Sequence, residues 1–250
     1  MSSRPYLSVV IPAYNEQTNL QAGVLEKVHQ YLKQQSYPWE VIIVDDGSTD
    51  QTLKLLHSWA KKPNWQVIAN PHQGKATTVK TGIFAAQGEL VLFTDFDQAT
   101  PLSEIEKLLP FIKKNYDIVI GSREVKGSQR EGEPWYRHLM GKVFNFSVQL
   151  LTIRGIRDTQ CGFKLFTRPI AQKLFQQLVV YSNGREKQAF TGAFDVELLF
   201  LAQKHGYKIA EVPVHWRHVH TERVNPVNDS IRMFCDLLRI RLADLSGKYK

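Results

Sequence analysis

The architecture of this protein is most clearly indicated by Val41-Ile42-Ile43-Val44-Asp45-Asp46-Gly47-Ser48-Thr49-Asp50, where four apolar residues lead directly into a polar cluster. A short, continuous run of β-branched residues predicts a strand that is buried on both faces, as in a parallel sheet. The polar cluster begins where this strand ends. The same arrangement follows the apolar runs at 7–12, 90–93 and 117–120.

Apolar runs and helical periodicity alternate along the first half of the chain. Strand-like runs occur at 7–12, 41–44, 67–69, 90–93 and 117–120, and helical spacing occurs at 18–34, 52–59, 75–86 and 101–113. This alternation predicts a doubly wound α/β fold, with a mostly parallel sheet flanked by helices. Ligands of such sheets bind beyond the carboxyl ends of the strands, which is where the polar clusters fall.

The second half of the chain is less regular. The alternation stops near residue 125, so we expect a single domain over 1–250, with a regular half at about 1–124 and an extension at about 125–250. The extension ends in an amphipathic pattern from Asn228 to Leu245, with apolar residues at helical spacing. This helix either packs against the domain or lies on a membrane surface.

Composition and charge limit the function classes. The formal net charge of +8 suits an anionic partner, such as a phosphate-bearing ligand, an anionic membrane or nucleic acid. Nucleic acid is disfavoured because the clusters at the strand ends are acidic and the sequence has no recognised nucleic-acid-binding motif. The sequence has no leader pattern and no apolar run of membrane-spanning length, and its two cysteines suit buried free thiols, so we expect a cytoplasmic protein.

Asp95 and Asp97 form the sharpest chemical signal. They follow the strand-like run at 90–93, so both carboxylates are expected near one point at the sheet edge. Two carboxylates so close together repel each other unless a cation lies between them. Hard oxygen ligands favour Mg²⁺ or Mn²⁺, which would also bind a diphosphate. The alternative is a solvated acidic turn or a helix cap.

The loop after Val44 is a second candidate. Asp45 at the strand end is expected to bind a ligand, because Gly47 permits a tight turn there, whereas the role of Asp46 stays open. Lys75 stands at the start of a predicted helix, where backbone amides and an ammonium group can meet an anion. Without the other clusters, this last segment would be only a loop.

Three stretches, 9–16, 43–50 and 95–97, together resemble the family 2 inverting glycosyltransferases, which have the GT-A fold. Further motifs at 97–101, 121–123, 158–166, 194–197 and 211–216 resemble the dolichyl-phosphate glucosyltransferase and polyprenyl-phosphate mannosyltransferase branch, the glucosyltransferase more closely. The resemblance extends from Leu7 to about Arg241. It implies that the first half binds a nucleotide-sugar donor and that the second half is an acceptor-side extension.

The resemblance also implies site residues. The donor would contact Pro12, Tyr14, Glu16, Asp45, Asp46, Lys75, Asp95 and Gln160, and the metal, Mg²⁺ or Mn²⁺, would be held by Asp95 and Asp97. Catalysis and acceptor contact would involve Arg123, Lys164 and Asp195. Asp195 would be the general base for an alcohol acceptor, whereas a phosphate acceptor is already an anionic nucleophile and needs none.

The implied reaction is metal-dependent, inverting transfer of a hexose, most closely glucose from UDP-glucose, to polyprenyl or dolichyl phosphate. The alternatives are a GDP-mannose-dependent enzyme, transfer to another saccharide or lipid acceptor, and a nucleotide-sugar sensor without catalysis. A lipid-linked acceptor implies peripheral contact with the cytoplasmic face of a membrane. The sequence lacks the branch's usual membrane anchors, lengthens 181–192 and changes a basic motif at 221–224, and its apolar run at 143–151 either contacts a membrane or belongs to the core.

Overall fold

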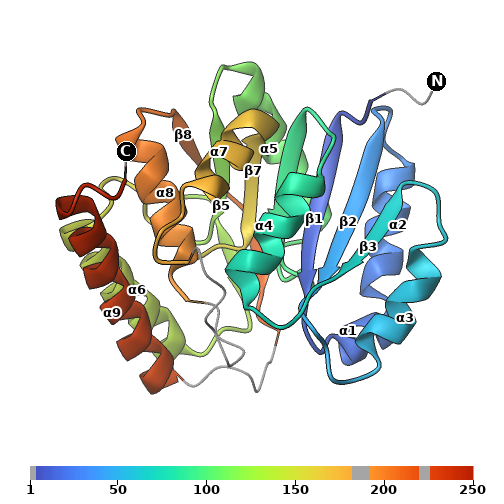
Figure 1. The fold of residues 1–250 in the computed structure, drawn as a ribbon, viewed down its shortest axis with the longest axis horizontal. Coiled ribbons are helices and arrows are strands. Elements are labelled where there is room, and N and C mark those ends of the chain that lie inside the picture. Colours follow the sequence, from blue (N-terminus) through green and yellow to red (C-terminus); the bar gives the residue numbers. More distant parts are fainter. Residues whose placement is uncertain (1–3, 182–191, 220–225, 250) are drawn as a thin grey trace.

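A seven-stranded sheet forms the centre of the molecule in a computed structural model that describes residues 4–181, 192–219 and 226–249 (Figure 1). The strand order is β3-β2-β1-β4-β7-β5-β8, and only β7 runs antiparallel to its neighbours. The strands are β1 (Leu7–Ala13), β2 (Trp39–Asp45), β3 (Trp65–Ala69), β4 (Leu90–Thr94), β5 (Ile118–Ser122), β7 (Phe163–Thr167) and β8 (Ile209–Pro213). The predicted mostly parallel α/β fold is therefore confirmed.

Helices cover both faces of this sheet. The first half of the chain contributes α1 (Gln17–Gln21), α2 (Val24–Lys33), α3 (Thr52–Trp59), α4 (Lys75–Ala85), the 3-10 turn η1 (Leu102–Glu104) and α5 (Ile105–Lys113). The second half contributes α6 (Trp135–Leu151), α7 (Arg168–Gln176), α8 (Phe194–Lys204) and α9 (Pro226–Leu245). Two further short strands, β6 (Gln129–Glu131) and β9 (His215–Arg217), pair with each other outside the main sheet.

The alternation of side chains along the strands produces two cores. Val10 and Ile42 point into the core beneath α4, α7 and α8, while Val9 and Ile43 point into the core beneath α2, α3 and α5. Successive residues of a strand face opposite sides, so a strand covered on both sides must be apolar throughout. This requirement explains the continuous apolar runs in the sequence.

The helix expected at 18–34 is broken in the structure. Gly23 adopts a left-handed conformation with φ of 73°, and it separates α1 from α2. Glycine takes this conformation without the steric cost that a side chain would bring. The apolar spacing alone did not reveal the break, because Leu20 and Val24 both face the core on either side of it.

Strand β7 is the element that most affects the site. It inserts between β4 and β5 in antiparallel orientation, with Phe163 opposite Thr94. The residues that precede an antiparallel strand lie at the same edge as the residues that follow its parallel neighbours. The 160–164 segment is thereby brought beside Asp95, although more than sixty residues separate them in the sequence.

The C-terminal extension bears on the two alternatives given for the apolar run at 143–151. Helices α6 and α9 lie side by side beyond β8, at the end of the molecule opposite β3 (Figure 1). The run at 143–151 does not belong to the core as a whole, because Val143, Phe146 and Leu150 are exposed and only Val148 is fully buried. Across the described part of the chain, no helix has the length and apolar character needed to cross a bilayer.

One further expectation holds only in part. Cys161 is a buried free thiol, as expected, but Cys235 is a free thiol on the exposed side of α9. The features noted at 182–191 and 221–224 lie outside the described residues.

Candidate active site at the carboxyl edge of the sheet

The loops that follow β1 and β2 are tied together by hydrogen bonds. The backbone N–H of Asn15 donates to the Ser48 hydroxyl, and the backbone N–H of Thr49 donates to the Asn15 side-chain oxygen at 2.8 Å. The backbone N–H of Glu16 donates to the Thr52 hydroxyl at 2.7 Å. These bonds explain why the two motifs occur together, since each loop supplies the partners of the other.

Asp45 and Asp46 occupy different environments in this edge. Asp45 ends β2 and accepts hydrogen bonds from the backbone and hydroxyl of Ser48. Asp46 turns its carboxylate toward the start of α4, where it accepts from the backbone N–H of Gln73 at 2.9 Å and of Gly74 at 3.0 Å. Asp46 therefore positions the loop that carries Lys75, in addition to any contact with a ligand.

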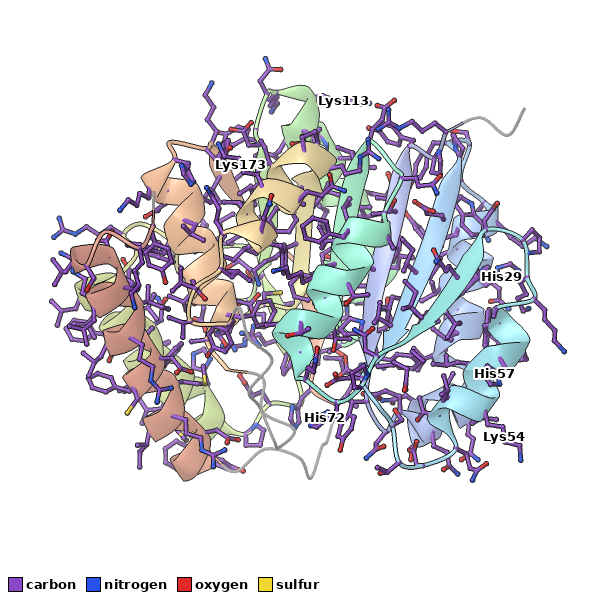
Figure 2. The ribbon with its side chains drawn as sticks, viewed as in Figure 1. His29, Lys54, His57, His72, Lys113 and Lys173 are labelled. Carbon is purple, nitrogen blue, oxygen red and sulfur yellow. The ribbon has the colours of Figure 1, made fainter. Side chains whose placement is uncertain are left out.

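An aromatic pair lies beside these carboxylates. The rings of Tyr14 and His72 are stacked with their centroids 4.4 Å apart, and His72 lies at the lower edge of the sheet in the view of Figure 2. Gly47 makes this approach possible, because a Cβ there would lie 2.8 Å from the His72 backbone nitrogen. Pro12 and Tyr14 are both half-buried, so they contribute to the surface at this edge of the sheet. The position of His72 at this edge was not predicted from the sequence.

The acidic pair after β4 lies next to Lys75. The Lys75 ammonium nitrogen is 2.5 Å from Asp95 Oδ1, so the helix start and the acidic pair meet at one point. Burial, followed by the charge of Asp95, raises the pKa of Asp97 to about 6. Burial lowers the pKa of Lys75, but the charges of Asp95 and Asp195 outweigh it and leave that pKa raised. A positive charge is therefore strongly favoured beside this pair.

The position of Asp95 depends on Gly162. A Cβ at Gly162 would lie 2.0 Å from Asp95 Oδ2, so any larger residue would occupy the place of this carboxylate. The Asp95 backbone N–H also donates to the Gly162 carbonyl oxygen at 3.1 Å. Sequence reasoning quoted Gly162 in a motif but did not predict that it limits the position of Asp95.

The two carboxylates at this point suit a divalent cation that is also coordinated by a phosphate. Asp95 and Asp97 offer carboxylate oxygens, which Mg²⁺ and Mn²⁺ prefer. Among the described residues, no three His, Cys, Asp or Glu side chains gather to hold a metal ion by themselves. At nucleotide sites, Mg²⁺ is usually coordinated by one or two carboxylates together with phosphate and water oxygens.

Lys164 and Asp195 form a buried ion pair behind the acidic pair. Lys164 projects from β7, and its ammonium nitrogen lies 2.5 Å from Asp195 Oδ1 at the start of α8. Both side chains are almost fully shielded from solvent. Burial raises the pKa of Asp195 despite the opposing effect of Lys164. The ring of Phe93 lies within 6 Å of both the Lys164 and the Lys75 ammonium nitrogens.

Arg123 is held by a second buried ion pair. Its Nε and Nη2 atoms donate to the two oxygens of Asp158 at 2.7 and 2.9 Å, and its backbone N–H donates to the same carboxylate. Burial alone would raise the pKa of Asp158, but the Arg123 guanidinium holds it at about 2. The guanidinium also lies over the Trp216 ring. Asp158 and Trp216 thus fix the orientation of Arg123 and leave its Nη1 outside the ion pair.

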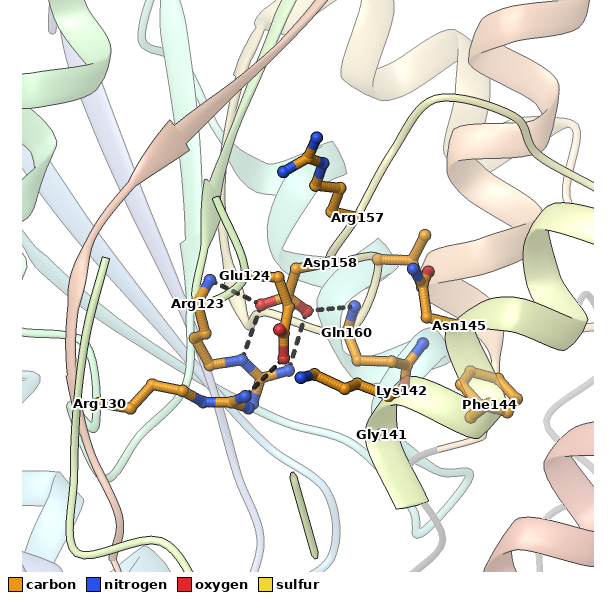
Figure 3. A pocket seen from close by; sticks show the side chains of 11 residues that line it. Arg123, Glu124, Arg130, Gly141, Lys142, Phe144, Asn145, Arg157, Asp158 and Gln160 are labelled. Atoms are coloured by element: carbon orange, nitrogen blue, oxygen red, sulfur yellow. Dashed lines mark hydrogen bonds and ion pairs between the residues drawn. The ribbon is translucent and has the colours of Figure 1, made fainter. Parts of the chain in front are cut away.

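A pocket of about 220 Å³ opens beside Arg123 (Figure 3). Its charged lining is mainly basic and consists of Arg123, Arg130, Lys142, Arg157, Glu124 and Asp158. Gln160 Nε2 and Thr159 Oγ1, also in the lining, are buried and have no hydrogen-bond partner among the described residues. Buried polar atoms without partners are uncommon, so these two indicate a polar ligand. The chemistry of the pocket suits an anion such as a phosphate.

The predicted site residues fall into two groups along this edge. Asp45, Lys75, Asp95 and Asp97 gather near the ends of β2 and β4, together with Asp195 and Lys164 behind them. Arg123 and Gln160 line the basic pocket at the end of β5. The basic stretch 123–137, which suggests a phosphate-binding surface in the sequence, supplies Arg123 and Arg130 to this pocket. Sequence reasoning missed Lys142 and Arg157 as members of it, because they come from separate segments that only the fold brings together.

Comparison with known proteins identifies the family. The family model for glycosyl transferase family 2 matches residues 8–175, which is more than half of the chain. The chain therefore belongs to glycosyl transferase family 2, as the sequence motifs predicted.

Individual relatives agree with this placement. The dolichyl-phosphate beta-glucosyltransferase of Dictyostelium discoideum is 38% identical over 260 residues, which span 98% of this chain and 76% of the relative. The human dolichyl-phosphate beta-glucosyltransferase is 36% identical, over 98% of this chain and 77% of the relative. A solved structure of glucosyl-3-phosphoglycerate synthase from Mycobacterium tuberculosis, in complex with Mn²⁺, UDP and glucosyl-3-phosphoglycerate, has a TM-score of 0.63 and 17% identity, with 98% of this chain and 81% of the other covered. The last comparison establishes the GT-A fold.

Proposed function

We propose that the protein transfers glucose from UDP-glucose to a polyprenyl or dolichyl phosphate, with inversion at the anomeric carbon. The observation that carries this proposal is that one edge of the sheet holds both an acidic pair suited to a metal-bound diphosphate and a basic pocket suited to a second phosphate. Two relatives are dolichyl-phosphate beta-glucosyltransferases, and their names support the same sugar and acceptor.

The donor would bind across the ends of β1, β2 and β4. The nucleoside would lie against Pro12 and Tyr14, with Asp45 and Glu16 accepting hydrogen bonds from it. Asp46 would keep the start of α4 in place, and Lys75 would turn from Asp95 toward the diphosphate. Gln160 would contact the sugar or the acceptor from the opposite side, since its amide group is buried without a partner.

Asp95 and Asp97 would hold Mg²⁺ or Mn²⁺. When bound, such an ion stabilises the negative charge that develops on the departing diphosphate. The Gly162 backbone would keep Asp95 at the position where it can act as a ligand. Because Asp97 has a raised pKa, binding of the ion would also favour its ionised form.

The acceptor phosphate would bind in the basic pocket. Lys142 and Arg157 would supply most of the neutralising charge, because Arg123 and Arg130 are already paired with Asp158 and Glu124. Thr159 and Gln160 would offer hydrogen bonds. A phosphate oxygen is already an anionic nucleophile, so its correct position beside the donor would suffice for the reaction.

Asp195 would not act as a general base in this reaction. Its Oδ1 atom is held by Lys164, and the pair is buried. We assign both residues to positioning, because they support the edge on which the sugar lies. An alcohol acceptor would require a general base. The ion pair with Lys164 makes Asp195 a poor candidate for that role.

A GDP-mannose-dependent enzyme is the closest alternative, since the pocket chemistry is the same for both donors. A lipid-linked acceptor would be met at a membrane surface, so we also propose peripheral attachment to the cytoplasmic face of a membrane.

The donor assignment is tested by incubating the protein with labelled UDP-glucose or GDP-mannose, a polyprenyl phosphate and Mn²⁺. We expect transfer from UDP-glucose, and we expect Asp95→Asn and Asp97→Asn to remove it while circular dichroism shows a preserved fold. Transfer from GDP-mannose alone would replace the donor assignment. Full activity in both variants would refute the metal assignment.

The acceptor pocket is tested separately. Arg157→Gln and Lys142→Gln should raise the KM for polyprenyl phosphate by about tenfold each, because each removes one charge from a phosphate contact. The affinity for UDP, measured by calorimetry, should not change. A loss of UDP affinity with an unchanged acceptor KM would place the acceptor elsewhere.

A further inference from the structure

The exposed apolar side chains of this protein are concentrated on two neighbouring helices. Twelve large hydrophobic side chains are exposed in the described part of the chain, and eleven of them belong to α6 or α9. They are Trp135, Tyr136, Leu139, Val143, Phe146 and Leu150 on α6, and Ile231, Phe234, Leu238, Leu242 and Leu245 on α9. Phe84 on α4 is the twelfth.

The exposed residues of each helix form a stripe. On α6, positions 135, 139, 143, 146 and 150 recur every three or four residues, and on α9 the same is true of positions 231, 234, 238, 242 and 245. Residues at this spacing share one face of a helix. Phe146 and Leu150 are about 70% exposed, so the stripes face away from the core. A contiguous apolar surface of this kind on a monomer indicates an interaction site.

We infer that the α6–α9 face, defined by these two stripes, is the surface through which the protein docks on a lipid bilayer that contains anionic lipids. This inference rests on the proposed lipid-phosphate acceptor, and it names the part of the molecule that meets the membrane.

The position of the basic pocket favours a bilayer as the occupant. Helix α6 carries the exposed stripe and also contributes Gly141, Lys142, Phe144 and Asn145 to the pocket lining. These residues fall between Leu139 and Phe146 in sequence, so one helix carries both the exposed stripe and one side of the basic pocket.

The charge and aromatic content of α6 support the same occupant. The helix contains Arg137 and Lys142 but no acidic residue. Trp135 and Tyr136 stand at its start, and such side chains are enriched where proteins meet the headgroup layer. A second copy of this chain would bring two basic α6 helices together, whereas anionic headgroups would neutralise them.

The test is flotation of the protein with vesicles of phosphatidylcholine, with and without phosphatidylserine. We expect the protein to float with both and more strongly with the anionic vesicles. The paired changes Phe146→Glu with Leu150→Glu, and Leu238→Glu with Leu242→Glu, should each lower the partition coefficient by ~100-fold, because each lost apolar side chain accounts for ~tenfold. Phe84→Glu is the matched control, since it alters the exposed hydrophobic residue outside this face, and it should float like the wild type.

Activity on a short, water-soluble isoprenyl phosphate separates this inference from the proposed function. Both paired variants should retain the wild-type rate on this acceptor and lose activity on long-chain acceptor in vesicles. A wild-type protein that stays unbound to both vesicle types, or that forms a stable dimer in light scattering with the two paired variants monomeric, would overturn the docking surface. Absence of transfer to the soluble acceptor by a protein that floats would instead count against the proposed function alone.

Discussion

Gly162→Ala is the substitution whose effect follows most directly from the geometry. The added Cβ would lie 2.0 Å from Asp95 Oδ2, whereas an ordinary contact is at least 3.4 Å, so the carboxylate must move by more than about 1 Å. The Gly162 backbone has little freedom to yield, since it immediately precedes β7, which is paired with β4 and β5, and its carbonyl accepts from the Asp95 N–H. A displacement of about 1 Å at a catalytic centre costs on the order of 100-fold in rate.

We therefore expect kcat/KM of Gly162→Ala for UDP-glucose to fall about 100-fold, and Mn²⁺ affinity measured by calorimetry to fall with it. Gly206→Ala is the matched control, because its Cβ would meet nothing within 4 Å and only its positive φ of 73° opposes the change. This control should lose about 1 kcal/mol of stability and no activity. A folded Gly162→Ala protein with wild-type kcat/KM and Mn²⁺ affinity would refute the role given to this glycine.

Three other perturbations test the electrostatics of the site. The folded-state pKa of Asp97 is raised to about 6, so the metal-free protein should lose up to about 3 kcal/mol of stability as the pH rises from about 4 to 6. In urea unfolding with EDTA, Asp97→Asn should flatten this part of the stability profile. An unchanged slope in the variant would contradict the raised pKa. Lys164→Met should destabilise the fold by about 3–5 kcal/mol, since it leaves Asp195 buried without its partner, and adding Asp195→Leu should restore most of the loss in the same assay. Lys75→Met should bind Mn²⁺ more tightly than the wild type when no donor is present, because a competing ammonium group is removed from Asp95, and weaker binding in calorimetry would contradict this competition.

The residue cluster at the ends of β1, β2 and β4 could be predicted from the sequence because its signals are local. Apolar runs of strand length, each followed by polar residues, placed Asp45 and Asp95 at one edge of a parallel sheet. The family resemblance then supplied roles that spacing alone left open. The break at Gly23 was missed because the apolar pattern continues across it.

The basic pocket and the 160–164 segment could not be predicted to the same extent because their residues are distant in sequence. The direction of β7 determines whether 160–164 lies beside Asp95 or at the other end of the sheet, and the sequence does not reveal that direction. The Arg123–Asp158 pair depends on the same arrangement. The exposure of Phe146 and Leu150 could not be predicted either. Apolar residues at helical spacing have the same pattern whether their face packs on the core or contacts an outside partner.

The proposed function depends on the basic pocket, which we expect to select a lipid phosphate as the acceptor. Its most direct test is to supply labelled UDP-glucose and Mn²⁺ together with either a polyprenyl phosphate or the corresponding polyprenol, and to measure label in the lipid extract. We expect metal-dependent labelling with the phosphate and none with the alcohol. Equal labelling of both lipids, or labelling of the alcohol alone, would contradict the claim, because the pocket would then contribute nothing to the choice of nucleophile.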